Sequence, residues 1–242
     1  MNVRMKSKNS TAVKSRKKPR IDAHTLMVNE IFHSIQGESS FAGRPCVFLR
    51  LTYCNLRCSY CDTEYAFYQG EPLDIDDVLA AIHSYDCPLI EITGGEPLLQ
   101  EPVFNLMRRL CDDGLEVLLE TGGSRSVAEV DPRVHKIVDM KCPSSNMSHK
   151  NLLANLGYLS ERDELKFVIG TRGDYEWSLK LLRKHPELSA VGAILLSPVY
   201  GKIPPVRIVD WMLADRLQKE FPNIRFQTQM HKAVWPPDMR GV

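Results

Sequence analysis

The sequence predicts an α/β fold built on a parallel sheet. Short apolar runs alternate along the chain with longer amphipathic stretches, and this alternation is typical of consecutive strand–helix–strand units. Polar and glycine-rich segments follow directly after several apolar runs, where parallel sheets bind their ligands. An open doubly wound sheet and a full or partial barrel both satisfy these two observations.

Seven apolar segments are predicted strands. Each is short, rich in aliphatic or aromatic residues, and bounded by polar or turn-forming residues. A complete barrel needs eight strand–helix units, so if the sheet curls it is expected to form a partial or distorted (β/α) barrel. The seven segments are 46–51, 88–93, 116–120, 136–140, 165–169, 193–197 and 224–228.

Four amphipathic segments between these strands are predicted helices. The first begins at Asp74, whose carboxylate suits an N-cap, and the second ends at Gly114, which suits a C-cap. Their lengths are sufficient to connect neighbouring parallel strands. The helices are expected over 74–85, 102–114, 174–186 and 206–221.

Five strand ends carry groups that suit a binding site. The carboxyl ends of parallel strands share one edge of the sheet, so these groups are expected to surround a single enzyme site. In chain order they are Cys54, the segment GGEP at 94–97, the segment TGG at 121–123, Lys141, and the segment SPVYG at 197–201.

The chain has an uneven charge distribution beneath a formal net charge of +1. Residues 1–20 contain eight Lys or Arg and no acid, so residues 21–242 sum to about −7. A nucleic-acid or acidic-partner contact is one interpretation of this segment. A solvated, disordered arm over 1–22 followed by one core domain over 23–242 is favoured, because no aromatic residues are interleaved with the charges.

The sequence also predicts a cytoplasmic protein. No apolar run is long enough to span a membrane, and no apolar segment near the N-terminus indicates secretion. The seven cysteines are an odd number without a regular framework, which fits a reducing compartment.

Three of these cysteines, Cys54, Cys58 and Cys61, lie within eight residues. A structural zinc site would need a fourth ligand, disulfides are unexpected in this compartment, and the polar neighbours argue against chance clustering in a core. A four-iron cluster held by three thiolates, with one iron open to another ligand, is the remaining explanation.

The C-x3-C-x2-C spacing, with Tyr60 before the last cysteine, resembles that of the radical S-adenosylmethionine superfamily. The segment TGGEP at 93–97 is similar to the glycine-rich segment that holds the methionine amino group in those enzymes. A Gly-Gly turn before a helix is its ordinary structural interpretation, and the cysteine loop upstream makes the ligand-binding interpretation stronger. The resemblance implies a partial or distorted (β/α) barrel of the radical S-adenosylmethionine type.

A narrower resemblance covers most of the chain. The segments QGE at 36–38, AGRP at 42–45 and CDT at 61–63, with Arg50 four residues before the first cysteine, resemble the opening of the 7-carboxy-7-deazaguanine synthase family. The similarity extends from about Glu30 to the HK pair at 231–232.

That resemblance implies a carbon–nitrogen lyase of queuosine and 7-deazapurine biosynthesis. The expected reaction converts 6-carboxy-5,6,7,8-tetrahydropterin to 7-carboxy-7-deazaguanine with loss of ammonia. A 5′-deoxyadenosyl radical takes a hydrogen atom from C6, the ring contracts, and S-adenosylmethionine is regenerated. The implied cofactors are one 4Fe–4S cluster per chain, S-adenosylmethionine and Mg²⁺.

The family pattern also assigns residues. Cys54, Cys58 and Cys61 would hold the cluster, and the Thr63 hydroxyl would bind Mg²⁺, although an ST-turn is its structural alternative. Arg50 would clamp the substrate carboxylate, since a guanidinium matches a carboxylate with two prongs. The remaining expected substrate contacts are Ile35, Gln36, Gly37, Glu38, Thr93 and His231.

The expected S-adenosylmethionine contacts come from several strand ends. Asp139 and Met140 depart from the Ser-Pro-Lys sequence common in the family, and Ser197 stands where glutamine is frequent, whereas Lys141 is retained. The full set is Tyr60, Cys61, Asp62, Gly95, Glu96, Glu120, Asp139, Met140, Lys141, Ser197, Pro198, Val199 and Tyr200.

Two other functions are compatible with parts of the pattern. An activase that installs a glycyl radical in a partner protein shares the cysteine spacing and TGGEP, but QGE, Arg50 and Thr63 favour a small carboxylated substrate. A noncatalytic metal-binding module with a basic arm would need a fourth ligand. The resemblance further implies a homodimer and a flavodoxin- or ferredoxin-type electron donor, without a membrane or nucleic-acid partner.

Overall fold

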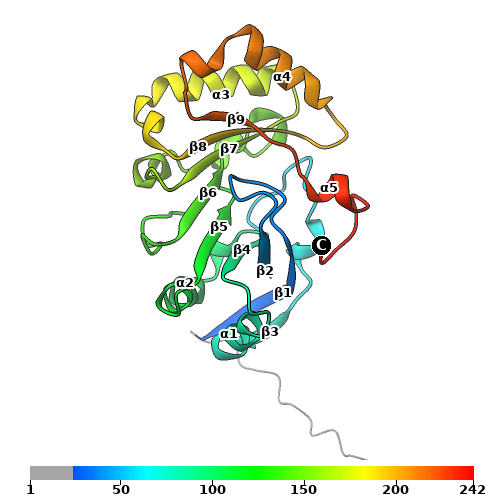
Figure 1. The fold of residues 1–242 in the computed structure, drawn as a ribbon, viewed down its shortest axis with the longest axis vertical. Helices are drawn as coiled ribbons and strands as arrows, with labels where there is room; N and C mark the ends of the chain where they lie inside the picture. Colours follow the sequence, from blue (N-terminus) through cyan, green and yellow to red (C-terminus); the bar gives the residue numbers. More distant parts are fainter. Residues whose placement is uncertain (1–23) are drawn as a thin grey trace, which may run out of the picture.

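The computed structural model describes residues 24–242, so the predicted basic arm lies outside the described residues. The described chain forms one nine-stranded sheet in the order β3-β1-β2-β4-β5-β6-β7-β8-β9. This sheet curls without closing, and its helices lie along the outside (Figure 1). The mixed α/β architecture confirms the predicted partial, distorted barrel.

All seven predicted strands are present, and each pairs in parallel with its neighbour. The last of them is only three residues long because it is the edge of the sheet, whereas the prediction extended to residue 228. The strands are β2 (Pro45–Leu51), β4 (Leu89–Gly94), β5 (Glu116–Thr121), β6 (His135–Asp139), β7 (Glu164–Ile169), β8 (Ala193–Pro198) and β9 (Ile224–Phe226).

Two strands were not predicted, and both belong to antiparallel pairs. Strand β1 (Thr25–Ile35) pairs with β2, and a register shift between Val28 and Glu30 breaks the period-two alternation that would have revealed it. Strand β3 (Glu71–Asp74) is a four-residue edge strand that contains Pro72. Together they extend the sheet beyond β2.

The four predicted helices are confirmed, with shifted ends. Asp74 caps α1 (Ile75–His83) by accepting a hydrogen bond from the Asp76 amide, and Gly114 follows α2 (Pro102–Asp112) with a φ of +84°. Helix α3 (Arg172–Lys184) begins two residues earlier than predicted, because the Thr171 hydroxyl caps it.

Helix α4 (Pro205–Ala214) ends seven residues before the predicted end. Arg216 adopts a left-handed conformation with a φ of +52°, so the chain leaves the helix there and continues into a short turn. A four-residue helix, α5 (His231–Val234), then lies against the open side of the barrel (Figure 1).

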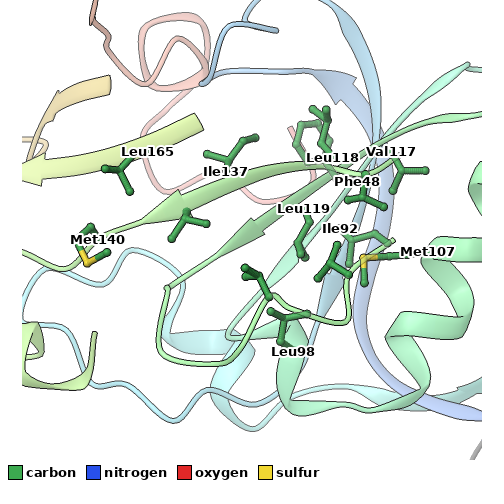
Figure 2. Packing of buried hydrophobic residues seen from close by; sticks show 14 of the residues in the cluster. Phe48, Ile92, Leu98, Met107, Val117, Leu118, Leu119, Ile137, Met140 and Leu165 are labelled. Atoms are coloured by element: carbon green, nitrogen blue, oxygen red, sulfur yellow. The ribbon is translucent and has the colours of Figure 1, made fainter. Parts of the chain in front are cut away.

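The hydrophobic core fills the space between the sheet and its outer helices. Ile92 on β4 and Leu119 on β5 are fully buried beside Met107 of α2 (Figure 2). Successive strand residues face opposite sides of a sheet, so the intervening residues Glu91 and Glu120 face the barrel interior. Because these two interior positions carry charged side chains instead of aliphatic ones, the barrel interior suits a polar ligand.

The loop between β1 and β2 closes the end of the barrel opposite to the cysteines. Its residues bond to strand starts on the far side: the Glu38 carboxylate accepts from Lys166 at 2.8 Å, the Ser40 hydroxyl donates to Glu164, and Arg44 pairs with Glu116. Ligands in this fold therefore have a protein floor beneath the strand ends, and we name this segment, residues 36–44, the floor loop.

Candidate active site

A cavity of about 800 Å³ occupies the barrel interior. Such a volume lies in the upper part of the range of about 300–1,000 Å³ that ligand pockets have, and it suits a cofactor together with a small substrate. All five predicted strand ends contribute to its wall, so the expectation of a single site is met. Of the predicted site residues, all except Glu96 and Met140 line the cavity.

The three cysteines lie together at the strand-end side of this cavity, on the loop after β2. Cys54, Cys58 and Cys61 are half-buried and unpaired. Burial raises the pKa of each thiol, and the neighbouring thiols raise it further. Iron binding to these thiols would therefore be accompanied by the release of protons.

The glycines of TGGEP allow close contact between two loops. A Cβ on Gly94 would stand 2.2 Å from the Leu51 carbonyl oxygen, and one on Gly95 would stand 2.2 Å from that of Tyr53. Gly94 also has a φ of +142°. These glycines therefore bring the end of β4 directly against the cysteine loop.

The donors present fit a 4Fe–4S cluster with one open iron. Three thiols line the cavity, and none of the other cysteines belongs to its described wall. Among residues 24–242, no group of three or more Cys, His, Asp or Glu side chains has the arrangement of a single-ion site. The donor set thus has the soft sulfur ligands that iron–sulfur clusters use, and one ligand too few for full coordination.

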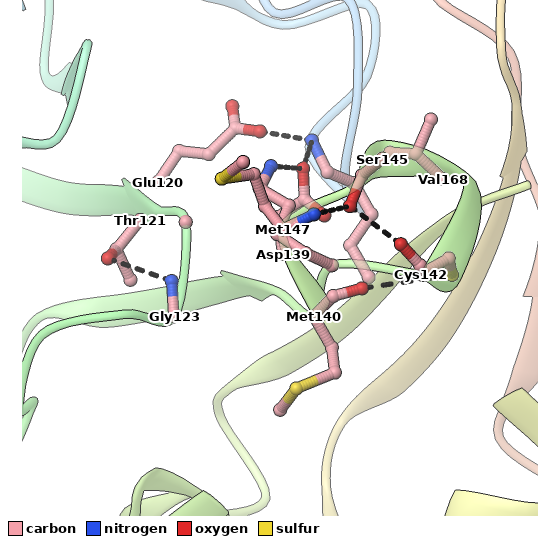
Figure 3. Close-up of polar contacts among 12 residues, drawn as sticks. Glu120, Thr121, Gly123, Asp139, Met140, Cys142, Ser145, Met147 and Val168 are labelled. Atoms are coloured by element: carbon pink, nitrogen blue, oxygen red, sulfur yellow. Dashed lines mark hydrogen bonds and ion pairs between the residues drawn. The ribbon is translucent and has the colours of Figure 1, made fainter. Parts of the chain in front are cut away.

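Asp139, at the end of β6, offers an acceptor for a second ligand. Its Oδ2 accepts from Lys141 at 2.7 Å, whereas its Oδ1 is buried with no hydrogen-bond partner (Figure 3 shows the surrounding contacts). A buried acceptor without a donor is costly, so a ligand hydroxyl is the expected partner. This observation fits the sugar hydroxyls of S-adenosylmethionine.

Glu96 and Met140 support the site without lining it. The fully buried Glu96 carboxylate accepts hydrogen bonds from the Thr121 hydroxyl at 2.8 Å and the Gly122 amide at 2.8 Å, tying β4 to β5. The Met140 side chain packs in the hydrophobic core, on the side of β6 away from Asp139. The family pattern predicts that both residues contact S-adenosylmethionine. In the structure, neither side chain lines the cavity, so direct contacts from these side chains are not supported.

Arg50 points into the cavity beside Thr93, its register partner on β4. Its Nε donates to the Glu30 carboxylate at 2.7 Å, and the Tyr65 hydroxyl donates to the same oxygen at 3.0 Å. Burial would lower the pKa of Arg50, but Tyr65 and Glu30 raise it. Within the described chain, the two terminal nitrogens have no hydrogen-bond partner, so they are available to a ligand carboxylate.

Gln36 uses its amide within the protein. Its Nε2 donates to the buried Glu91 carboxyl, and its Oε1 accepts from the Glu38 amide at 3.0 Å. Burial and the nearby Glu120 raise the pKa of Glu91 well above its usual value. Gln36 therefore fixes the floor loop, and because it also lines the cavity, its expected contact with the substrate stays a prediction.

Lys166 on β7 is a central residue that sequence reasoning missed. Its ammonium contacts the Glu38 carboxylate at 2.8 Å, the Glu120 carboxylate, and Asp139 at 3.9 Å, and its side chain is only 4% exposed. Burial lowers the pKa of Lys166, but these three carboxylates raise it well above its usual value. Lys166 therefore holds two carboxylates side by side in the cavity wall.

The segment after β9 closes another side of the cavity. Lys232 pairs with Asp62 at 2.5 Å, and Asp62 accepts from the Thr63 hydroxyl at 2.9 Å. Burial would raise the pKa of Asp62, but Lys232 and its hydrogen bonds hold it below the usual range. Thr63 thus bonds to a side chain and does not form the ST-turn that was its alternative.

His231 packs directly on the floor loop. A Cβ on Gly37 would lie 2.3 Å from the ring Nδ1 of His231, so this contact requires glycine. Burial lowers the pKa of His231, which favours the neutral imidazole. The final residues 237–242 also line the cavity, a position that no sequence signal indicated.

The comparisons with known proteins agree with this geometry. The radical SAM superfamily model matches residues 49–196. A 7-carboxy-7-deazaguanine synthase from Chlorobaculum tepidum is 46% identical over 90% of this chain and 97% of that protein. The chain belongs to the 7-carboxy-7-deazaguanine synthase family. A second relative of that name, from Koribacter versatilis, is 40% identical over 90% of this chain and its own full length.

One solved structure supports the same family, and another shares only the fold. The crystal structure of QueE from Escherichia coli is 25% identical, with a TM-score of 0.68, over 86% of this chain and 95% of that chain. SuiB from Streptococcus suis, bound to S-adenosylmethionine, is 14% identical with a TM-score of 0.53 over 73% of this chain and 45% of that chain, and shares the fold.

Family membership makes the chain a radical S-adenosylmethionine lyase of 7-deazapurine biosynthesis. A 4Fe–4S cluster and S-adenosylmethionine are the cofactors that the family implies. The glycyl-radical activase and the noncatalytic metal-binding module are not favoured. No helix in the described part of the chain has the length and apolar character to cross a membrane.

Proposed function

We propose that this member of the 7-carboxy-7-deazaguanine synthase family acts on 6-carboxy-5,6,7,8-tetrahydropterin. The main support for this proposal is that one cavity contains both the three-thiol loop and the guanidinium of Arg50. The two terminal nitrogens of that guanidinium are available to bind a carboxylate. A substrate held by its carboxylate at Arg50 would lie inside the barrel, shielded from water. Its product would be 7-carboxy-7-deazaguanine, with ammonia lost as the ring contracts.

The chain's own residues bind, orient and shield the reactants. The cluster and S-adenosylmethionine, when bound, supply the radical that removes a hydrogen atom from C6 of the substrate. Asp139 and Lys141 would hold the cofactor's polar groups at the end of β6, and Ser197 to Tyr200 would contact its adenine at the end of β8. The carboxylates of Glu38 and Glu120 accept hydrogen bonds, so they suit the N–H groups of the pterin ring.

Mg²⁺ is proposed at Thr63, whose hydroxyl lines the cavity beside Asp62. Hard oxygen donors, completed by substrate oxygens and water, suit this ion. Thr63→Ala should therefore reduce the stimulation of turnover by added Mg²⁺ several-fold while the cluster stays intact. Titrating Mg²⁺ into both proteins checks this, and an unchanged metal dependence would remove Thr63 from the metal site. Thr63→Ser, which retains the hydroxyl, is the matched control.

The substrate proposal is tested by anaerobic turnover. The protein is reconstituted with iron and sulfide, reduced with dithionite, and mixed with S-adenosylmethionine, Mg²⁺ and 6-carboxy-5,6,7,8-tetrahydropterin. Chromatography should then show 7-carboxy-7-deazaguanine. Formation of 5′-deoxyadenosine without this product would retain the radical chemistry and reject the substrate.

The remaining proposals concern the cellular location, the electron donor and the oligomeric state of the enzyme. A cytoplasmic location is supported by the need to keep Cys54, Cys58 and Cys61 reduced for iron binding. A flavodoxin- or ferredoxin-type protein would supply the electron, and a homodimer would be the assembly. Size-exclusion chromatography with light scattering tests the last of these.

A further inference from the structure

The proposed function gives Tyr65 no role, although this residue lines the cavity. Tyr65 belongs to a short helical turn, Glu64–Phe67, that follows the cysteine loop, and its side chain is half-buried. The guanidinium carbon of Arg240 lies 3.8 Å from the centroid of the Tyr65 ring, and the guanidinium carbon of Arg50 lies 5.9 Å from it. Tyr65 is therefore a neighbour of the arginine that is proposed to bind the substrate carboxylate.

Tyr65 and Arg50 donate hydrogen bonds to the same atom. The Tyr65 hydroxyl donates to Oε1 of Glu30 at 3.0 Å, and this oxygen also accepts from Arg50 Nε at 2.7 Å. The Arg50 side chain is 17% exposed and the Glu30 side chain is 21% exposed, so water competes little for these bonds. The three side chains therefore form one hydrogen-bonded unit in the cavity wall.

This unit limits Glu30 to a single contact with Arg50. A carboxylate often makes two parallel hydrogen bonds to a guanidinium, and a pair on this side of Arg50 would use Nε and one terminal nitrogen. In the described chain, Glu30 bonds to Nε alone. The Tyr65 hydroxyl supplies a second hydrogen bond to the carboxylate, which reduces its need for a terminal nitrogen. Both terminal nitrogens of Arg50 therefore stay available to a ligand.

We propose that Tyr65 is a positioning residue for Arg50. Its hydroxyl engages Glu30, and both terminal nitrogens of Arg50 are thereby kept for the substrate carboxylate. The Arg240 guanidinium donates to the Gln69 side chain at 3.3 Å and packs on the Tyr65 ring, which restricts movement of that ring. The inference rests on the proposed function, because Arg50 needs this arrangement only for a ligand that has a carboxylate.

Tyr65→Phe removes the hydroxyl and retains the ring. Glu30 is then expected to take a terminal nitrogen of Arg50, so that only a fraction of the enzyme is ready to bind a carboxylate. The KM for 6-carboxy-5,6,7,8-tetrahydropterin should rise about tenfold, because the apparent affinity falls with the competent fraction. The kcat should stay within about threefold of wild type, since the bound substrate restores the alignment of Arg50.

Two stable pterins separate positioning from a general structural effect. 6-Carboxypterin has the carboxylate and pterin lacks it, and anaerobic calorimetry measures the binding of each to cluster-loaded enzyme with S-adenosylmethionine. Tyr65→Phe should bind 6-carboxypterin about tenfold more weakly, and pterin within about twofold of wild type. Tyr85→Phe is the matched control and should leave both affinities unchanged. The Tyr85 hydroxyl also donates a hydrogen bond, to the Ile31 carbonyl at 3.3 Å, but Tyr85 lies outside the cavity wall.

A second substitution tests the part played by Glu30. Because the competing carboxylate causes the loss in Tyr65→Phe, adding Glu30→Gln should recover at least about threefold of the affinity for 6-carboxypterin. An equal loss for both pterins, unchanged discrimination in Tyr65→Phe, or no recovery on adding Glu30→Gln would overturn the inference. Failure of the substrate proposal gives a different result: the wild-type enzyme would itself bind the two pterins with equal affinity, and both proposals would fall.

Discussion

Cys58→Ala should lose the iron–sulfur absorption bands and reduce turnover to the level of an enzyme-free blank. The three half-buried thiols on the loop after β2 are the only thiols in the described cavity wall, so no other thiol replaces a missing one. The measurement is iron content and visible absorption after anaerobic reconstitution, followed by the turnover assay. Activity retained by Cys58→Ala would contradict the radical mechanism.

Cys111→Ala is the matched control for this experiment. Cys111 is also an unpaired, half-buried cysteine, but it lies on α2 and does not line the cavity. The control should retain the cluster bands and full turnover. A comparable loss in both variants would indicate general destabilisation of the fold and not the removal of an iron ligand.

Arg50→Leu should reduce kcat/KM for the carboxylated pterin by about 30-fold to several thousand-fold. Truncating one partner of a buried hydrogen-bonded charge pair costs about 2–5 kcal/mol, and each 1.4 kcal/mol is a factor of ten. Arg50→Lys should recover part of this loss, because it retains the charge but not the two-pronged geometry. The assay is steady-state turnover of cluster-loaded enzyme.

Glu30→Gln separates substrate binding from the internal ion pair of Arg50. This variant weakens the contact at Arg50 Nε and leaves both terminal nitrogens in place. It should therefore lose much less activity than Arg50→Leu. Arg50→Leu at wild-type efficiency would remove Arg50 from the substrate site.

The residues that sequence analysis identified best have local signals. Cys54, Cys58 and Cys61 stand at a diagnostic spacing, and Arg50 is conspicuous as a charge within an apolar strand. The strand-end rule also placed Lys141 correctly in the cavity wall, because parallel strands present their carboxyl ends at one edge. Each of these predictions needed only a few neighbouring residues.

The residues that sequence analysis missed depend on long-range contacts. Lys166 lies in a predicted strand, but its partner Glu38 is 128 positions away. The sequence motifs of the floor loop over 36–44 predict substrate contacts. Its second role, which is to close the barrel, depends on the distant Glu164 and Glu116. Periodicity reports which face a residue occupies, and it does not report what lies across the barrel from it.

The two glycines of TGGEP were assigned correctly to the site for an incomplete reason. They were expected to allow a ligand to approach, whereas in the structure Gly94 and Gly95 allow the backbone of Leu51 and Tyr53 to approach. That reason is not visible in sequence, because it requires knowing that β2 and β4 are neighbours.

The ratio of product formed to S-adenosylmethionine consumed tests the central claim most directly. Cluster-loaded enzyme is given one equivalent of S-adenosylmethionine and an excess of 6-carboxy-5,6,7,8-tetrahydropterin under anaerobic reduction. Many equivalents of 7-carboxy-7-deazaguanine per S-adenosylmethionine consumed are expected, since the cofactor is regenerated in the cavity. One product or fewer per S-adenosylmethionine, with stoichiometric 5′-deoxyadenosine, would contradict the account.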